Sequence, residues 1–172
     1  MGLPAEGLSA AASSLTGADV EFLRRCIALS QEARAEGRHP FAASVVDAQG
    51  VVISACYNNS VPPGGDPTQH AELRAAAEAS SRVTRNALAS ATLYSSAEPC
   101  AMCAGAIYWT GIGRVVYALS EVKLRALTGD NAQNPTLSLP CREVFARGQR
   151  EVRVIGPLLE VEAAAAHSDF WD

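Results

Sequence analysis

The sequence predicts a single α/β domain in which helices cover a layered sheet. Five short runs of apolar and β-branched residues alternate with longer segments of helical pattern, the order typical of such folds. Glycine and proline mark the boundaries between these segments. The length of 172 residues suits one complete core, and no internal repeat or linker divides the chain.

The first half of the chain predicts a helix, a hairpin and a second helix. Asp19 is a suitable N-cap for the first helix, and Leu23 and Ile27 lie near one face of it. A three-residue turn ending in Gly50 joins two strand-like runs, which favours a β-hairpin. Three prolines and two glycines then indicate a loop before an Ala-, Glu- and Leu-rich helix. In order, we expect these elements at residues 19–36, 41–47, 51–57, 58–67 and 68–80.

The second half continues the alternation of strands and helices. Pro99 is expected in the first turn of a helix, where its missing N–H costs nothing, and Gly111 and Gly113 end that helix. A less regular stretch follows Gly129. We expect strands at residues 91–96, 115–118 and 152–155, and helices at residues 99–109, 120–127, 142–147 and 158–170.

The charge balance argues against a nucleic-acid partner, and no segment predicts a membrane span. The net charge is −4 and no stretch concentrates Lys or Arg, whereas nucleic-acid binding normally uses a basic face. No apolar run approaches the roughly 20 residues that cross a bilayer.

Residues 1–18 are predicted to be a flexible tail, which leaves residues 19–172 as the folded domain. The tail is rich in Ala and Ser and lacks the positive region and the sustained apolar core of a secretory signal. We therefore expect a cytoplasmic protein with reduced thiols. Its five cysteines then indicate a metal site or structural thiols in preference to disulfides.

Two short motifs carry the candidate chemistry: His70-Ala71-Glu72 and Pro99-Cys100-Ala101-Met102-Cys103. Each opens a predicted helix. Cys100 and Cys103 project from one face of the first turn, where the helix dipole and unpaired N–H groups favour thiolates. Thiolates and an imidazole suit tetrahedral zinc, so the expected ligands of one Zn²⁺ per chain are His70, Cys100 and Cys103.

Three protein ligands indicate a catalytic site, because a structural zinc site normally has a fourth. The remaining cysteines and histidines lie in other predicted elements. Glu72 is two residues from His70, so it is expected to sit near the metal without ligating it. It would take a proton from a metal-activated water and pass it to a ring nitrogen and then to a departing amine. The predicted reaction is hydrolytic loss of ammonia.

Each motif alone has an ordinary explanation, since a CxxC pair is often a redox site and an HxE string can lie on any helix surface. Together, with 26 residues between Glu72 and Pro99, they are far more specific. At these residues the chain resembles the cytidine deaminase superfamily, whose zinc enzymes carry H-x-E…P-C-x-x-C. The resemblance extends from about Asp19 to the C-terminus. It implies a three-layer α/β/α fold with a five-stranded mixed sheet, and a homodimer.

Within the superfamily the chain most resembles the bacterial guanine deaminase-like branch. That resemblance implies that Phe41 packs on the bound base and that Asn58 or Asn59 hydrogen-bonds its ring. Strand register favours Asn58, whereas counting back from His70 favours Asn59. From the residues alone, Phe41 and Trp109 are more often core residues than substrate contacts, and the Asn pair is explained by a turn. Further substrate contacts are implied at Ala71, Trp109, Asn131, Phe170 and Trp171, with the terminal aromatics closing the pocket in their own chain or in a neighbouring one.

One position departs from the guanine deaminase pattern. Asn131 stands where those enzymes carry the second of two successive acids, which recognises the guanine edge. An amide offers a donor as well as an acceptor and no charge, so it suits a different hydrogen-bonding pattern. The expected substrate is therefore a free aminated ring that includes guanine-like purines, s-triazines and cytosine-like rings.

Two other functions compete with a free-base deaminase. The segments Arg114-Val115-Val116-Tyr117 and Ser168-Asp169-Phe170 also resemble tRNA adenosine deaminases, but the charge of −4 weighs against an RNA substrate. A zinc-stabilised, non-catalytic module would need a fourth protein ligand and would tolerate replacement of Glu72.

Overall fold

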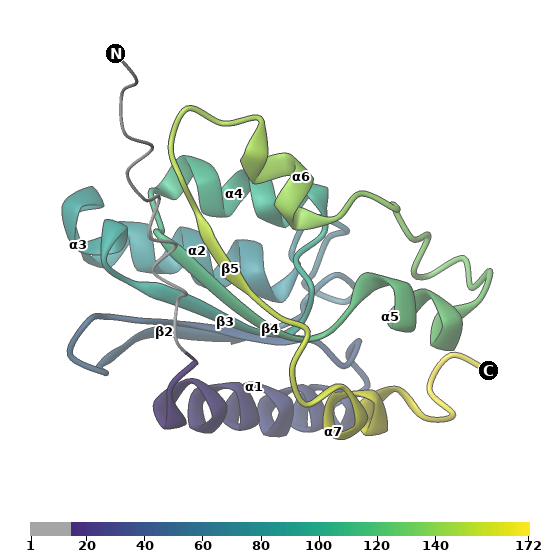
Figure 1. Cartoon of the computed structure of the whole chain (residues 1–172). Helices are drawn as coiled ribbons and strands as arrows, with labels where there is room; N and C mark the ends of the chain where they lie inside the picture. Colours follow the sequence, from purple (N-terminus) through teal and green to yellow (C-terminus); the bar gives the residue numbers. More distant parts are fainter. Residues whose placement is uncertain (1–14) are drawn as a thin grey trace, which may run out of the picture.

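The computed structural model describes residues 15–172 and shows a five-stranded mixed sheet between two layers of helices (Figure 1). The strand order is β2-β1-β3-β4-β5. Strand β1 runs antiparallel to both of its neighbours, whereas β3, β4 and β5 are parallel to one another. The strands are β1 (Ala42–Val46), β2 (Val52–Tyr57), β3 (Thr92–Ala97), β4 (Arg114–Leu119) and β5 (Arg153–Ile155). The predicted three-layer α/β/α fold with a five-stranded mixed sheet is confirmed.

Helices α1 and α7 cover one face of the sheet, and α2 and α4 cover the other, with α6 packed against α4 (Figure 1). Successive residues of β4 alternate between the two cores, with Val115 among the α2 and α4 side chains and Val116 beside Leu23 of α1. The helices are α1 (Gly17–Ala35), α2 (Ala71–Arg82), α3 (Arg85–Ala89), α4 (Ala101–Thr110), α5 (Glu121–Thr128), α6 (Cys141–Ala146) and α7 (Glu160–Ala164), followed by the 3₁₀ helix η1 (Ala165–His167).

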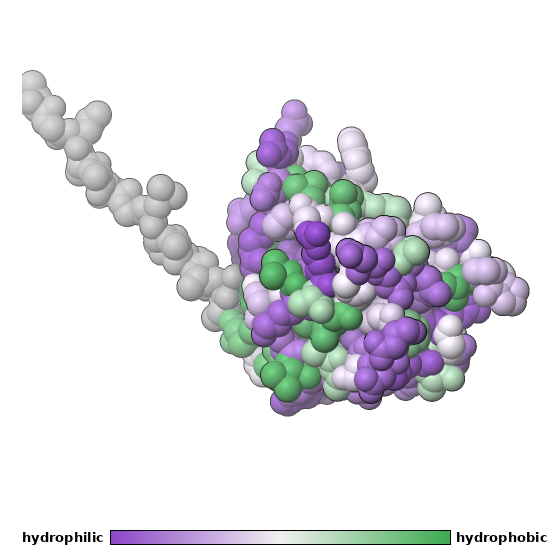
Figure 2. Space-filling view, turned by 90° about the vertical axis from the view of Figure 1, so that its right-hand side faces the viewer, coloured by the Kyte–Doolittle hydropathy of each residue, from purple (hydrophilic) through white to green (hydrophobic). Residues whose placement is uncertain are grey.

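The outer surface is of mixed character on the side of the molecule where α5 lies in Figure 1. Figure 2 views that side and shows apolar residues interspersed with hydrophilic ones. Such a mixture is usual on protein surfaces, because polar groups cannot cover them completely. Within residues 15–172, no helix is both long and apolar enough to cross a membrane.

The first helix begins earlier than predicted. Thr16 is its N-cap, and its hydroxyl accepts a hydrogen bond from the Asp19 N–H while the Asp19 carboxylate accepts one from the Thr16 N–H. This reciprocal capping box places Asp19 in the third helical position, so its prediction as the N-cap is wrong. Gly17 and Ala18, assigned to the tail, belong to the helix, and the tail from 1 to 14 lies outside the described residues.

Other features of the helices also differ from the prediction. Helix α2 begins at Ala71, with His70 as its N-cap, and not at residue 68. Helix α4 has Cys100 as its N-cap, so Pro99 precedes the helix and does not lie in its first turn. Helix α3 was not predicted, although Thr84 caps it by accepting from the Ala87 N–H at 3.3 Å. Residues 158–170 form only α7 and η1. The left-handed Leu159 delays the start of α7 to Glu160, and η1 ends at His167, before the left-handed Asp169.

The site lies on the side of the sheet that is formed by strand ends, and this side is called the sheet edge below. Strands β2, β3 and β4 all end at this edge, and β1, which runs antiparallel to β2 and β3, begins there. The residues next to these strand ends are Phe41, Asn58, Glu98 and Glu121, and all four line one cavity. Helices α2 and α4 begin at the same edge and contribute His70, Glu72, Cys100 and Met102 to the wall.

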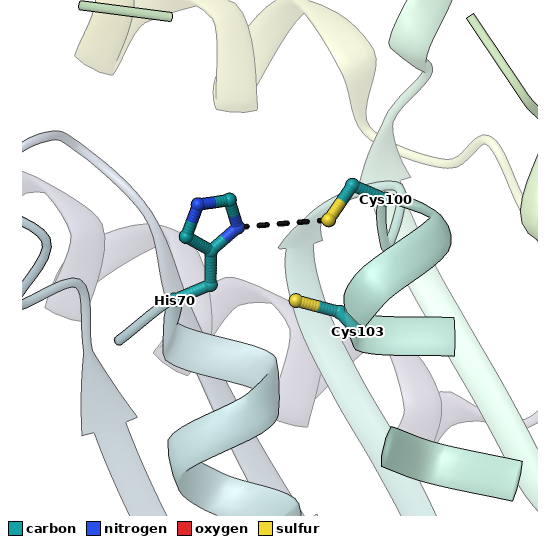
Figure 3. A group of neighbouring side chains, drawn as sticks. All are labelled: His70, Cys100 and Cys103. Carbon is teal, nitrogen blue, oxygen red and sulfur yellow. Dashed lines mark hydrogen bonds between the residues drawn. The ribbon is translucent and has the colours of Figure 1, made fainter. Parts of the chain in front are cut away.

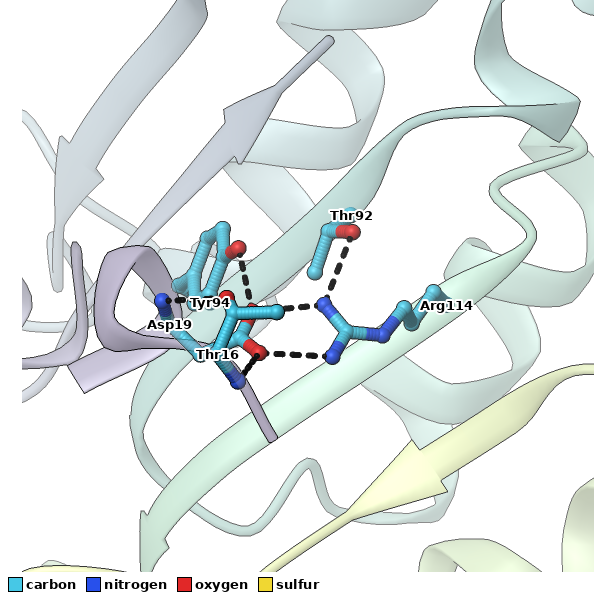
Figure 4. Close-up of polar contacts among 5 residues, drawn as sticks. All are labelled: Thr16, Asp19, Thr92, Tyr94 and Arg114. Atoms are coloured by element: carbon cyan, nitrogen blue, oxygen red, sulfur yellow. Dashed lines mark hydrogen bonds and ion pairs between the residues drawn. The ribbon is translucent and has the colours of Figure 1, made fainter. Parts of the chain in front are cut away.

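A buried ion pair ties α1 to the sheet (Figure 4). Both carboxylate oxygens of Asp19 accept from the Arg114 guanidinium, at 2.6 and 2.8 Å, and the Tyr94 hydroxyl donates to one of them at 2.8 Å. Burial opposes ionisation of Asp19, but the hydrogen bonds from Arg114, the Thr16 backbone and Tyr94 hold its pKa well below the usual value. The charged network therefore stabilises the native fold at neutral pH.

Replacing Asp19 with Asn should lower the free energy of unfolding by about 3 kcal/mol at pH 7, because Arg114 loses its partner in a largely buried position. The native pKa of Asp19 is depressed, so its contribution is complete above the unfolded value near 4 and is lost as the pH falls below it. Urea unfolding at pH 7 and pH 3 measures this. The difference between wild type and variant should shrink at pH 3; a difference independent of pH would contradict it. Glu21→Gln, in an exposed pair with Arg25 on the same helix, is the control and should change stability little.

Candidate active site

The ends of two helices bring the predicted metal ligands together (Figure 3). His70 is the N-cap of α2, Cys100 is the N-cap of α4, and Cys103 lies in the first turn of α4. Their ligand atoms all lie within 4.8 Å of one another, and His70 Nδ1 is 3.6 Å from Cys100 Sγ. Alanines on the inner face of α2, such as Ala75 and Ala76, are completely buried, which lets this helix pack closely against the sheet and α4. The three ligands predicted from the sequence thus form one cluster.

The thiols of the cluster differ in their tendency to ionise. The hydrogen bond from the Cys103 thiol, with help from His70 and the Cys103 backbone N–H, outweighs burial and lowers the pKa of Cys100 to about 4. The hydrogen bond to Cys100, together with burial, raises the pKa of the Cys103 thiol well above its usual value. Cys100 is therefore a ready anionic ligand, and a cation would have to displace the proton from Cys103.

Glu72 lies beside the cluster and is almost completely buried. Its Oε1 accepts from the Ser95 hydroxyl at 3.1 Å, and its Oε2 lies 3.6 Å from Cys103 Sγ. Burial raises the pKa of the Glu72 carboxyl, although the charge of His70 partly opposes this. A carboxyl with this environment readily takes up and returns a proton.

The donor set fits a zinc ion. One imidazole and two sulfurs are the ligand types that tetrahedral zinc prefers, and a coordination position remains for water. Within the described part of the chain, the group of potential metal donors consists of His70, Cys100 and Cys103. This composition matches the open site expected of a catalytic metal and not the closed site expected of a structural one.

A cavity of about 800 Å³ opens above the cluster. Phe41, Asn58 and Phe170 line it, as the sequence predicts. Asn58 Oδ1 accepts from the Ser60 N–H at 2.8 Å and from the Ser60 hydroxyl at 2.7 Å. Its amide NH₂ has no partner among residues 15–172 and remains available as a donor. Asn59 instead binds Arg38, Gln69 and the Gly64 carbonyl, so of the two asparagines it is Asn58 that faces the cavity.

Four other predicted contact residues do not line the cavity. The Asn131 amide donates to the Trp171 carbonyl at 2.7 Å, so it holds the C-terminal segment in place. Trp171 is buried behind Phe170 and packs on His39 and Phe41. Ala71 is completely buried in the core, and Trp109 is 73% exposed on α4. Phe170 therefore closes the pocket of its own chain, while Trp171 supports it from behind.

The cavity wall also contains residues that the sequence analysis did not single out. Glu98 and Glu121 lie near the metal ligands, and His39 lies beside the terminal aromatics. The loop at 132–137 supplies the remaining side of the mouth. The signal available in the sequence was position, because Glu98 and Glu121 come within three residues of the ends of two predicted strands. To select these two residues as part of the site, one must know that the two strands end at the same edge of the sheet.

The terminal aromatics rest on a neutral histidine. His167 is almost completely buried, and its Nδ1 accepts from the Trp171 indole N–H at 3.2 Å. Burial, followed by the charges of Arg34 and His39, lowers the pKa of His167 to about 4. Protonation would remove the acceptor that holds Trp171.

We expect His167 to make the fold sensitive to acid. The unfolded chain takes up this proton below pH 6.5, whereas the native chain does so only near pH 4, so stability present above pH 6.5 is lost as the pH falls between these values. The loss should reach roughly 3 kcal/mol at pH 4. Urea unfolding of wild type and His167→Gln from pH 7 to pH 4 measures it. The variant should show a shallower dependence on pH, and identical slopes would contradict this role.

The fold and the three-donor cluster beside a buried carboxyl are those of a zinc-binding deaminase domain. The sequence model of the cytidine and deoxycytidylate deaminase zinc-binding region matches residues 17–119. The chain belongs to this family.

Three known proteins show the range of its relatives. The protein named Probable cytosine deaminase of Schizosaccharomyces pombe is 42% identical over 160 residues, which cover 93% of this chain and 96% of that protein. The tRNA-specific adenosine deaminase of Haemophilus influenzae is 36% identical over 109 residues, or 63% of this chain and 62% of that enzyme. The solved structure of guanine deaminase from Nitrosomonas europaea superimposes with a TM-score of 0.73 at 27% identity, and covers 91% of this chain and 85% of that one.

Proposed function

We propose that the protein is a zinc-dependent aminohydrolase that converts a free aminated base, cytosine-like or guanine-like, to its carbonyl product and ammonia. The observation that carries this proposal is the buried Glu72 carboxyl beside a three-donor cluster at the base of a cavity. Zinc held by His70, Cys100 and Cys103 would act as a Lewis acid and lower the pKa of water toward 7.

The chain's own residues orient the substrate and move its protons. The ring would lie against Phe41, with a ring acceptor facing the free amide N–H of Asn58. Glu72 takes a proton from the attacking water and gives it to the ring nitrogen next to the amino-bearing carbon. Glu72 then carries the second proton of the same water to the exocyclic amine. A C–O bond forms, the C–N bond breaks, and ammonia leaves.

Two observations support a free base over tRNA. Phe170 narrows the mouth of the cavity, and a flipped base on an RNA backbone would need additional room and basic phosphate contacts there. Of the 23 residues around the cavity, none is Lys or Arg. The Schizosaccharomyces pombe protein is also more similar in sequence, at 42% identity, than the Haemophilus influenzae tRNA enzyme, at 36%.

The experiment that tests the proposal is a measurement of ammonia release by the zinc-loaded protein. The substrates are cytosine, guanine, isoguanine, adenine and aminated s-triazines, with unmodified tRNA assayed in parallel for inosine. Turnover of a free base is the expected result, and the preferred ring identifies the substrate. Inosine in tRNA with no turnover of any base would instead support the tRNA alternative and overturn the free-base assignment.

We also propose that the protein is a homodimer that uses α4. One face of this helix carries Met102, Gly105, Ala106 and Trp109, spaced as i, i+3, i+4 and i+7. Trp109 is 73% exposed, and a Cβ added at Gly105 would meet no atom within 4 Å. A second copy would cover this apolar helix face. Small residues at its centre would allow close approach, and the aromatic side chain would contribute a large contact area.

Sedimentation equilibrium should therefore show a dimer for wild type and at least a tenfold weaker association for Trp109→Glu. Each 1.4 kcal/mol lost at an interface weakens association about tenfold, and burying a charge there costs more than that. Val161→Glu, which changes an 85%-exposed residue on the opposite side of the sheet, is the matched control and should remain dimeric. A monomeric wild type would contradict the proposal.

A further inference from the structure

Glu121 has a position in the cavity that neither the metal cluster nor the helix it begins explains. It is the first residue of α5, and its half-buried side chain lines the cavity. The N-terminus of α5 is already capped, because the Ser120 hydroxyl accepts from the Lys123 N–H at 3.4 Å. Within residues 15–172 the Glu121 carboxylate has no hydrogen-bond or ion-pair partner. It is therefore an acceptor that the protein itself leaves unused.

The backbone of Glu121 is held firmly in place. Its N–H donates to Glu98 Oε2 at 3.1 Å, and Glu98 Oε1 accepts from the Cys141 N–H at 3.1 Å. The almost fully buried Glu98 thus links the end of β3 to the first residues of α5 and α6. Since Glu98 is also two residues from Cys100, the position of Glu121 relative to the metal cluster is fixed by the main chain.

Sheet topology places Glu121 across the cavity from Asn58. Asn58 follows β2, Glu121 follows β4, and two strands, β1 and β3, lie between them. Three strand spacings separate the two positions by about 14 Å at the sheet edge. The cavity lies between them, with Phe41 and Glu98 at its back, because these residues flank the two intervening strands. Both side chains line the cavity of about 800 Å³, which has room for a single heterocyclic ring.

The hydrogen-bonding capacities of the two walls are complementary to such a ring. Asn58 offers an unpaired amide N–H donor, and Glu121 offers an unpaired carboxylate acceptor. Burial, with the nearby negative charges of Cys100, Glu98 and Glu72, raises the pKa of Glu121 to about 7, and the charge of His70 opposes this only in part. An N–H group brought in by a ligand would supply the missing partner.

We propose that Glu121 is a specificity-determining residue whose carboxylate accepts a ring N–H of the bound base. This inference rests on the proposed function, since it assigns one edge of the substrate of that same site. It restricts the substrate to rings with an acceptor on the edge facing Asn58 and an N–H on the opposite edge. Cytosine and guanine both have such edges, whereas a ring methylated at the contacted nitrogen does not.

The test is a thermodynamic cycle that compares binding affinities after a substitution in the protein, a methylation of the ligand, and both changes together. Binding of cytosine, 1-methylcytosine, guanine and the 1-, 7- and 9-methylguanines is measured by calorimetry on the zinc-loaded Glu72→Ala protein, with and without Glu121→Ala. Glu121→Ala should weaken binding of the parent base about 10- to 100-fold, as expected for a hydrogen bond to a charged group. For the derivative methylated at the contacted nitrogen, the same substitution should change binding less than about twofold, or strengthen it.

Several outcomes would overturn the inference. An equal loss for the parent base and every methylated derivative would show that Glu121 does not contact a ring N–H, and so would the absence of any loss. Loss of zinc from Glu121→Ala would assign the residue to support of the metal ligands. Glu151→Ala, which changes an exposed acid near β5, is the control and should bind all ligands like its parent.

The outcomes for the inference and for the proposed function are separable. If the wild-type protein binds a base and shows the expected coupling but releases no ammonia, the deaminase proposal fails and the role of Glu121 stands. If the wild-type protein deaminates a base but Glu121→Ala binds the parent and methylated bases unchanged, the deaminase proposal stands and the role of Glu121 fails. If no base binds to the zinc-loaded protein, both fail.

Discussion

Replacing Glu72 with Ala is expected to lower kcat for base deamination by about 10³-fold or more, because among residues 15–172 it is the carboxyl that contacts the metal cluster. The same protein should keep its zinc and its fold, since Glu72 is not among the three metal donors. Steady-state ammonia release, zinc analysis and thermal unfolding together measure these three properties. Loss of the reaction with retention of metal would also exclude a non-catalytic, zinc-stabilised module.

Glu78→Gln is the matched control for Glu72→Ala. Glu78 lies on the same helix, but it pairs with Arg82 and accepts from the Cys56 thiol, outside the cavity. We expect nearly wild-type kcat from this variant. If both substitutions had the same small effect, Glu72 would not be the proton carrier.

The second large effect is expected from Cys100→Ala, which should lose zinc together with activity. Its thiolate is one of three donors, and its pKa near 4 makes it the donor already ionised at neutral pH. Loss of a residue that only hydrogen-bonds to a metal ligand lowers metal affinity about 10- to 100-fold. Loss of a direct ligand should therefore lower it more. Competition with a zinc-sensitive chelating dye measures the affinity.

Cys56→Ala provides the control for this second prediction. Cys56 is also a buried thiol, but it lies on β2 and interacts with Glu78, away from the metal cluster. It should bind zinc like wild type. Zinc affinity unchanged in Cys100→Ala would contradict the ligand assignment.

The metal site was predictable because its information is local. His70, Cys100 and Cys103 are short-range patterns at the starts of two helices, and a helix start fixes where its first-turn side chains point. The alternation of strands and helices predicted a layered α/β sheet, and the resemblance to the deaminase superfamily implied its five strands and two helical layers. Where boundaries differ, local capping or tertiary contacts decided them, as with Thr16 before α1 and the left-handed Asp169 near the C-terminus.

The cavity wall was less predictable because it depends on contacts between distant segments. Asn58 and Asn59 are neighbours, and only the hydrogen bonds of Asn59 to Arg38 and Gln69 show that the first of them faces the cavity. The resemblance to guanine deaminases implies a substrate contact at Asn131, yet the Asn131 amide donates to the Trp171 carbonyl. The sequence analysis missed Glu121 for the same reason. Its proposed role depends on the strand order, which places β1 and β3 between β2, followed by Asn58, and β4, followed by Glu121.

The central claim is tested most directly by following ammonia release from cytosine and guanine as zinc is removed and restored. We expect the zinc-loaded protein to release one ammonia for each base converted, the chelator-treated protein to release almost none, and added Zn²⁺ to restore the rate in proportion to occupancy. Full activity in the metal-free protein would contradict a zinc-dependent deaminase. So would a zinc-loaded protein that releases no ammonia from these two bases or from the other free aminated rings.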